Sequence, residues 1–148
     1  MMIKAVFVGS FDPFTVGHYD IVQRALPLFD RLIIGVGINE RKVYMNDTET
    51  RVADIIRIFN NNPKIEVQTY NDLTVDFAKR VGATFIVKGV RSVKDFEYER
   101  EQADINRRIS GIDTLLLCAD PQHASVSSSM VRELIHFGRD VSEFLPKF

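Results

Sequence analysis

The sequence contains no tryptophan and only one cysteine, Cys118, among its 148 residues. A single cysteine cannot form a disulfide within the chain, and it argues against a zinc site built from cysteines. Because Cys118 lies in the apolar run 115–119, we expect a buried thiol of the kind found in proteins of the reducing cytosol.

Long apolar segments and an excess of either charge are also missing. No apolar run approaches 18 residues and no signal peptide is visible, so we expect a soluble, cytoplasmic protein without a membrane partner. The net charge is −1, which disfavours a nucleic-acid partner because such proteins are usually basic. The 45% hydrophobic content is that of a folded globular chain, and the length suits a single domain, 1–148.

Apolar runs alternate with amphipathic segments along the chain. The predicted strands are 3–8, 32–38, 65–69, 84–87 and 114–119. The predicted helices are 17–29, 48–59, 73–81, 95–109 and 127–137, with a possible helical turn at 141–144. Strands followed in turn by helices predict an α/β fold, a single Rossmann-like doubly wound domain with a five-stranded parallel sheet. The strands are continuously apolar, as a sheet covered on both faces requires.

Residues 9–18, Gly-Ser-Phe-Asp-Pro-Phe-Thr-Val-Gly-His, follow the first predicted strand directly. A strand, a tight turn and a helix start form an anion site, because the first N–H groups of a helix are unpaired and its dipole favours negative charge. Gly9 and Gly17 let the backbone approach a phosphate closely, and His18 adds a side-chain donor. The segment is neither a Walker loop nor a dinucleotide fingerprint. An ordinary turn with a surface histidine would leave both glycines unexplained.

Polar and charged side chains follow four of the predicted strands. They are Ser10 and His18 after the first, Arg41 and Lys42 after the second, Lys88 and Arg91 after the fourth, and Ser125, Ser127, Ser128 and Ser129 after the fifth. Ligands of open α/β sheets bind outside the carboxyl ends of the strands. Each residue alone could be a solvated cation or a helix cap, but gathered on one rim they predict a site for a ligand with several phosphates.

The three serines at 127–129 open the last predicted helix. No Glu or Gln lies three residues after any of them, so no capping box engages their hydroxyls. We therefore expect at least one of these hydroxyls to be free to donate to a phosphate.

Residues 15–18 resemble the T-x-G-H form of the nucleotidyltransferase signature. Nearly the whole chain resembles the phosphopantetheine adenylyltransferase family, which joins ATP and 4′-phosphopantetheine to give dephospho-coenzyme A and pyrophosphate in coenzyme A synthesis. The most specific matches are 9–18, 88–91 together with 95–99, and 126–132. Thr15 favours this family, because related cytidylyltransferases and nicotinate-nucleotide adenylyltransferases usually carry a histidine there.

The resemblance implies a role for individual residues. The catalytic residues would be His18, Lys42 and Arg91. Phosphopantetheine would be bound by Ser10, Lys42, Thr74 and Lys88. ATP would be bound by Ser10, Phe11, His18, Gly89, Val90, Arg91, Glu99, His123, Ala124, Ser125, Val126, Ser127, Ser128 and Ser129. We expect Mg²⁺ to accompany ATP without protein ligands, and the resemblance implies a homohexamer.

Two positions depart from the family pattern. Lys88 stands where many members have an arginine, and a lysine lacks the bidentate fork of a guanidinium. Ser125 stands where an aromatic residue is common. Two alternative functions stay open: another enzyme of the same fold, such as a nicotinate-nucleotide adenylyltransferase or a cytidylyltransferase, or a nucleotide-binding sensor without turnover. Simple nucleotide binding requires neither His18 nor Lys42, which favours an enzyme.

Overall fold

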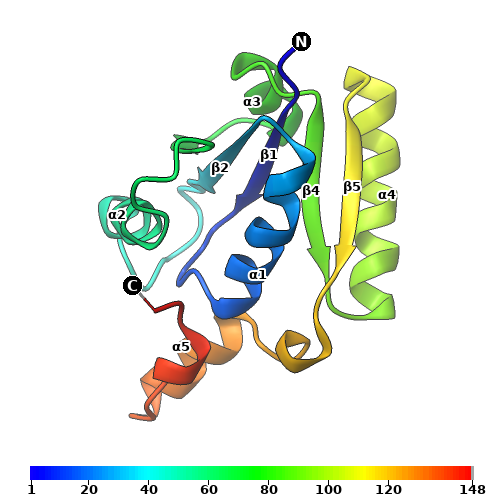
Figure 1. Cartoon of the computed structure of the whole chain (residues 1–148). Coiled ribbons are helices and arrows are strands. Elements are labelled where there is room, and N and C mark those ends of the chain that lie inside the picture. The colour runs from blue at the N-terminus through cyan, green and yellow to red at the C-terminus, as the bar shows by residue number, and fades with distance from the viewer. Residues whose placement is uncertain (148) are drawn as a thin grey trace.

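A parallel sheet lies at the centre of the computed structural model, which describes residues 1–147 (Figure 1). Its strands are β1 (Lys4–Gly9), β2 (Arg31–Gly37), β3 (Ile65–Tyr70), β4 (Phe85–Val90) and β5 (Asp113–Cys118). Their order across the sheet is β3-β2-β1-β4-β5, and each neighbouring pair is parallel. The predicted five-stranded α/β fold is therefore confirmed. Phe148, the last residue of the predicted domain 1–148, lies outside the described residues.

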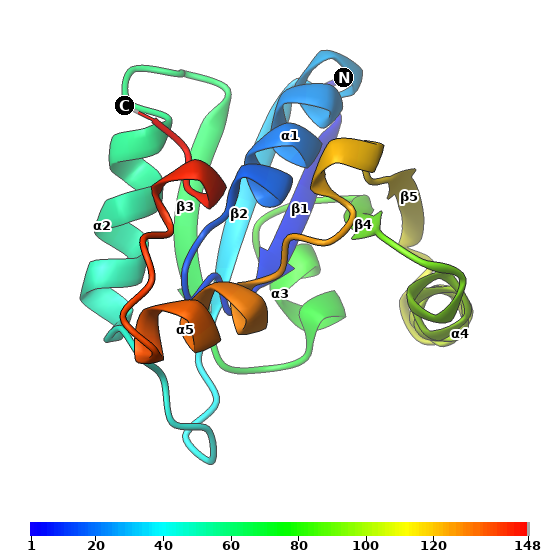
Figure 2. The same cartoon turned by 90° about the horizontal axis from the view of Figure 1, so that it is seen from below.

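Helices follow the strands on both faces of the sheet. They are α1 (Val16–Ala25), α2 (Thr48–Ile58), α3 (Thr74–Arg80), α4 (Val93–Ser110) and α5 (Ser128–His136), with short 3₁₀ turns at Leu26–Leu28, Pro121–His123 and Ser142–Phe144. Helices α1 and α2 cover one face, while α3 and α4 lie on the other (Figure 2). The first helix ends before its predicted end at Phe29, because Pro27 has no N–H to continue the α-helical ladder.

The core lies on the two faces of the central strands. Ala5 and Phe7 of β1 pack into the cluster beneath α1 and α2, whereas Val6 and Val8 pack into the cluster beneath α3, which contains the fully buried Phe77. This alternation follows from the two-residue period of a strand. The central strands thus have the continuous burial that the sequence predicted.

The two edge strands do not follow that prediction. β3 is largely half-buried, β5 has exposed ends, and no residue of α4 is buried. The prediction that Cys118 is buried is wrong, because this last residue of β5 is exposed. The apolar run 115–119 lies on an edge strand that only β4 pairs, so its end is left open on one side.

The strand order places a crevice between β1 and β4. After β1 the chain runs outward through β2 to β3, and it then returns across the sheet to β4 and β5. The connections therefore leave β1 and β4 in opposite directions. The carboxyl ends of two such neighbouring strands are where doubly wound folds bind their ligands.

Candidate active site

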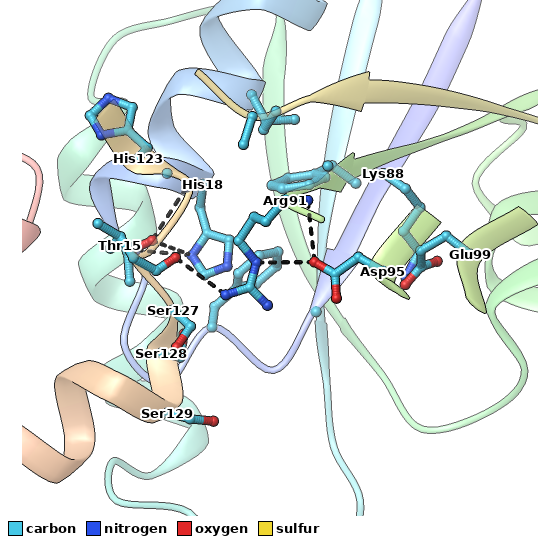
Figure 3. A pocket seen from close by; sticks show the side chains of 18 of the residues that line it. Thr15, His18, Lys88, Arg91, Asp95, Glu99, His123, Ser127, Ser128 and Ser129 are labelled. Carbon is cyan, nitrogen blue, oxygen red and sulfur yellow. Dashed lines mark hydrogen bonds and ion pairs between the residues drawn. The ribbon is translucent and has the colours of Figure 1, made fainter. Parts of the chain in front are cut away.

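A cavity of about 310 Å³ opens at the carboxyl ends of β1 and β4 (Figure 3). The predicted site residues that line it are Phe11, His18, Lys88, Gly89, Arg91, Glu99, His123, Val126, Ser127, Ser128 and Ser129. They come from β4, from the loops that follow β1 and β4, from the first turn of α1, from α4 and from the segment 123–129 that leads into α5. The structure therefore brings together residues that are more than 100 positions apart in the sequence.

Other predicted residues lie beside this cavity. Ser10 and Lys42 line a neighbouring cavity of about 640 Å³ at the ends of β1 and β2. Thr74 lines a third cavity, of about 250 Å³, between α3 and α4, and Lys88 lines both this cavity and the first one. The remaining predicted residues, Val90, Ala124 and Ser125, line none of these three cavities, and Val90 is buried.

The loop 10–15 between β1 and α1 is held by side chains from a distant helix. The Ser128 hydroxyl donates to the Pro13 carbonyl at 2.7 Å, and Arg132 Nη1 donates to the Asp12 carbonyl at 2.8 Å. Both donors lie on α5. Because loop carbonyls have no strand partner, these bonds satisfy them and fix α5 against the motif. The sequence analysis gave neither bond, since no local pattern shows contacts over 115 residues or more.

The Asp12 carboxylate joins the same loop to the segment 38–47 that follows β2. It is buried and accepts from the backbone N–H groups of Met45 at 2.7 Å and Asn46 at 3.0 Å. Nearby, Lys42 Nζ lies 3.2 Å from the Ser10 hydroxyl. The predicted pair Ser10 and Lys42 is thus brought into direct contact.

His18 is half-buried and forms a capping box with Thr15. Its Nδ1 accepts the backbone N–H of Thr15 at 2.9 Å, while the Thr15 hydroxyl accepts the N–H of His18. The proton of a neutral ring must then lie on Nε2. The ring packs against Phe11 and Phe14 at centroid distances of 5.0 and 5.2 Å. Burial first, and the positive charge of Arg91 second, lower the pKa of His18 from 6.5 to about 4.

The cations of the cavity are paired with carboxylates of α4. Arg91 Nε lies 3.3 Å from Asp95, and its Nη1 donates to the Val126 carbonyl at 3.5 Å. Lys88 Nζ lies 3.7 Å from Glu99. Figure 3 shows Arg91 between His18 and Asp95. Asp95 was not among the predicted site residues, and its contact with Arg91 depends on how β4 turns into α4.

The serines at the start of α5 have three different environments. The Ser127 side chain caps the helix by accepting the N–H three residues on, and the Ser128 hydroxyl is committed to the loop carbonyl. The Ser129 hydroxyl oxygen accepts from Arg132 at 3.2 Å, which leaves its proton available to a ligand. Ser127 likewise only accepts, so the prediction of at least one free hydroxyl fits both Ser127 and Ser129, and Ser129 is the one that does not cap the helix.

The arrangement suits an anion with several phosphates. Lys88 and Arg91 supply positive charge, His18 Nε2–H and Ser129 supply neutral donors, and the first turn of α5 adds backbone N–H groups. Within residues 1–147, no group of three or more His, Cys, Asp or Glu side chains could hold a metal ion. No helix in the described part of the chain combines the length and apolar character needed to cross a membrane.

A family model and individual relatives both match this chain, and they agree with each other. A family model described as cytidylyltransferase-like matches residues 6–134. A phosphopantetheine adenylyltransferase of Porphyromonas gingivalis is 56% identical over 143 residues, covering 97% of this chain and 94% of that protein. One of Phocaeicola vulgatus is 51% identical over 146 residues, covering 99% of this chain and 97% of that protein.

Solved structures agree with the fold. A bifunctional NMN adenylyltransferase/ADP ribose pyrophosphatase of Francisella tularensis superposes with a TM-score of 0.72 at 16% identity. The match covers 99% of this chain and 46% of that one. At this identity the likeness concerns the fold alone.

The ring of His18 should titrate far below an ordinary histidine. Its imidazole NMR signals, assigned with a His18→Gln variant, should move with a pKa of about 4. Between pH 6.5 and about 4, His18 is protonated in the unfolded chain but remains neutral in the folded protein. Lowering the pH through this window should therefore decrease the free energy of unfolding, and less so in the variant. A midpoint near 6.5 would contradict the buried, neutral ring.

Proposed function

The chain belongs to the phosphopantetheine adenylyltransferase family, which transfers the adenylyl group of ATP to 4′-phosphopantetheine, and on that premise we propose how its residues divide the two substrates. ATP would occupy the 310 Å³ cavity between β1 and β4. Phosphopantetheine would approach from the cavities beside it. The observation that carries this division is the position of Lys88, which lines both the first cavity and the one between α3 and α4.

The acceptor's phosphate is already a nucleophile. Its second pKa is about 6, so it is largely a dianion at neutral pH and needs no general base. One of its oxygens forms a bond to the α-phosphorus of ATP while the bond from that phosphorus to pyrophosphate breaks. Because two anions must meet, catalysis would rest on positioning and on stabilising negative charge.

His18 suits this chemistry as a neutral donor. Its Nδ1 is engaged by the Thr15 N–H, so it cannot serve as a base from that nitrogen, and its Nε2–H is left for the ligand. A low pKa keeps the ring neutral at physiological pH. We assign it to the transferred phosphate, where negative charge develops in the transition state.

Arg91 and Ser129 would hold the departing pyrophosphate. Both line the first cavity, and Asp95 fixes the direction of the guanidinium. Mg²⁺ would enter with ATP and neutralise phosphate charge, held by phosphate oxygens and water. The carboxylates on the cavity wall, Asp95 and Glu99, are paired with cations, which fits a metal ion carried by the nucleotide.

On the acceptor side, phosphopantetheine would meet cations and a cavity lined by both polar and apolar side chains. Lys42 and Ser10 would bind the acceptor phosphate, together with Lys88. The 250 Å³ cavity, lined by Thr74 and by residues of α3, α4, β4 and β5, would take the pantetheine arm. The Thr74 hydroxyl lies 3.4 Å from the Tyr70 hydroxyl, which orients a polar group in the wall of this cavity.

We also propose that the chain works as a homo-oligomer in the cytoplasm. The support for assembly is α4, which has no buried residue in the single chain. Its large exposed apolar side chains are Val93, Phe96, Tyr98, Ile105 and Ile109. A second copy of the chain would cover exposed apolar side chains of this kind, as the homohexamer of the family resemblance requires. A single exposed thiol suits a reducing compartment.

Two variants test the division of roles in an assay of dephospho-coenzyme A formation. His18→Ala should fold and lose kcat by roughly 10²–10³-fold, the effect of removing one donor to developing charge.

Lys88→Ala should raise the KM for phosphopantetheine and leave ATP binding, measured by calorimetry, nearly unchanged. If ATP binding were weakened and acceptor binding intact, the assignment of the two substrates to the cavities would have to be reversed. A wild-type protein that binds ATP without releasing pyrophosphate would instead support a sensor.

The serines of α5 offer a matched set of variants. Ser127→Ala and Ser128→Ala should each lower the free energy of unfolding by about 1 kcal/mol, because one removes a helix cap and the other a loop contact. Ser129→Ala should leave the Tm almost unchanged and raise the KM for ATP or lower kcat. If Ser129→Ala were destabilised and fully active, its hydroxyl would be structural and the pyrophosphate assignment wrong.

A further inference from the structure

Arg51 is a buried cation outside the three cavities described above. It lies on α2 with 2% of its surface exposed. Its Nη1 donates to the Ser10 carbonyl at 2.7 Å and to the Gly37 carbonyl at 3.2 Å, while Nη2 lies 3.2 Å from the Thr48 hydroxyl. Ser10 directly follows β1 and Gly37 ends β2, so one guanidinium joins the carboxyl ends of two neighbouring strands.

The same guanidinium holds the segment 38–47 through Tyr44. Arg51 Cζ lies 3.9 Å from the centroid of the Tyr44 ring, and the Tyr44 hydroxyl lies 3.4 Å from the Gly37 carbonyl. The Tyr44 oxygen also accepts the N–H of Asn39 at 2.9 Å. Tyr44 is therefore fixed by a stacked cation and by hydrogen bonds to the start of its own segment.

Lys42 lies between these fixed points. Its Nζ is 5.4 Å from the centroid of the Tyr44 ring and 3.2 Å from the Ser10 hydroxyl. Arg51 contacts both of these neighbours, the ring by stacking and Ser10 through its carbonyl. Without such support, a long lysine side chain on an exposed segment would lose its direction, since it has several freely rotating bonds.

The charge of Arg51 adds to this geometry. Among the ion pairs of residues 1–147, none joins Arg51 to a carboxylate, and its Nε has no hydrogen-bond partner. Burying a guanidinium without a carboxylate costs free energy. Asp47 interacts with Arg51 electrostatically without being one of these ion pairs. Positive charge therefore remains beside the Ser10 carbonyl, where it would attract a phosphate dianion.

We propose that Arg51 is a positioning residue for the acceptor half of the reaction. Arg51 fixes the positions of the Ser10 carbonyl and the Tyr44 ring. Ser10 and Tyr44 in turn fix the positions of the Lys42 ammonium and the Ser10 hydroxyl. The charge of Arg51 favours binding of the acceptor phosphate. The inference rests on the proposed function, because that function assigns Lys42 and Ser10 to phosphopantetheine. Arg51 itself touches neither substrate.

Kinetics of Arg51→Lys test the inference. A lysine keeps the charge but cannot stack its plane on Tyr44 while donating to two carbonyls. We expect the KM for phosphopantetheine to rise about tenfold or more, because small misplacements of a binding group are costly, and the KM for ATP to stay within about twofold. Arg57→Lys, an exposed arginine on the same helix, is the matched control and should leave both values unchanged.

A double-mutant cycle shows whether Arg51 acts through Lys42. In a Lys42→Ala background, Arg51→Lys should raise the phosphopantetheine KM much less than it does in the wild type, because the side chain to be positioned is gone. Equal effects in the two backgrounds would overturn the inference. So would a folded Arg51→Lys protein with a lowered Tm whose two KM values are unchanged or raised alike, since a purely structural role predicts that result.

Tyr44→Leu keeps the inference testable if Arg51→Lys fails to fold. Tyr44 is only half-buried, and its loss should raise the phosphopantetheine KM without changing the KM for ATP. An unchanged acceptor KM in this variant would overturn the inference. An unchanged acceptor KM in Lys42→Ala would instead contradict the proposed function, and with it the inference. Calorimetric titration of each variant with phosphopantetheine measures the binding affinity directly, so it distinguishes weakened acceptor binding from an effect on the chemical step.

Discussion

The site depends on how the carbonyl groups of the loop after β1 are satisfied. At residues 10–13 the chain has left the sheet, so its carbonyls have no strand partner, and buried polar groups must be paired. Side chains supply the partners: Arg51 from α2, and Arg132 and Ser128 from α5. These bonds join three distant segments at the motif. This one loop contacts α2 and the start of α5 and leads into the first turn of α1, so it positions these parts of the site.

The charges of the site follow a second constraint. Lys88 and Arg91 line one cavity together with the neutral ring of His18. Burial against phenylalanine rings first, and repulsion by Arg91 second, oppose a third positive charge there. Carboxylates of α4 direct the cations. Under the proposed function, phosphates entering this cavity would meet oriented donors that need little rearrangement, which is the condition for electrostatic stabilisation of a transition state.

Much of the fold could be read from local patterns, and part of the site as well. The apolar runs gave every strand, and the motif 9–18 gave the turn that carries His18. Other features depended on neighbours that no local pattern shows. Cys118 is exposed because β5 is an edge strand, and Lys88 meets Glu99 because β4 and α4 lie side by side. The three serines look alike in the sequence, yet each has a different partner.

The sequence by itself determined the succession of strands and helices along the chain, the turn at 9–18 and the family, because periodicity, caps and motifs act within a few residues of one another. Only the tertiary structure decided which residues meet: that Lys88 lies between two cavities, that Arg51 reaches Ser10, and that His18 is neutral. Contacts across 40 or more positions, and the pKa of a ring in a crowded cavity, depend on the distance and burial that packing alone creates.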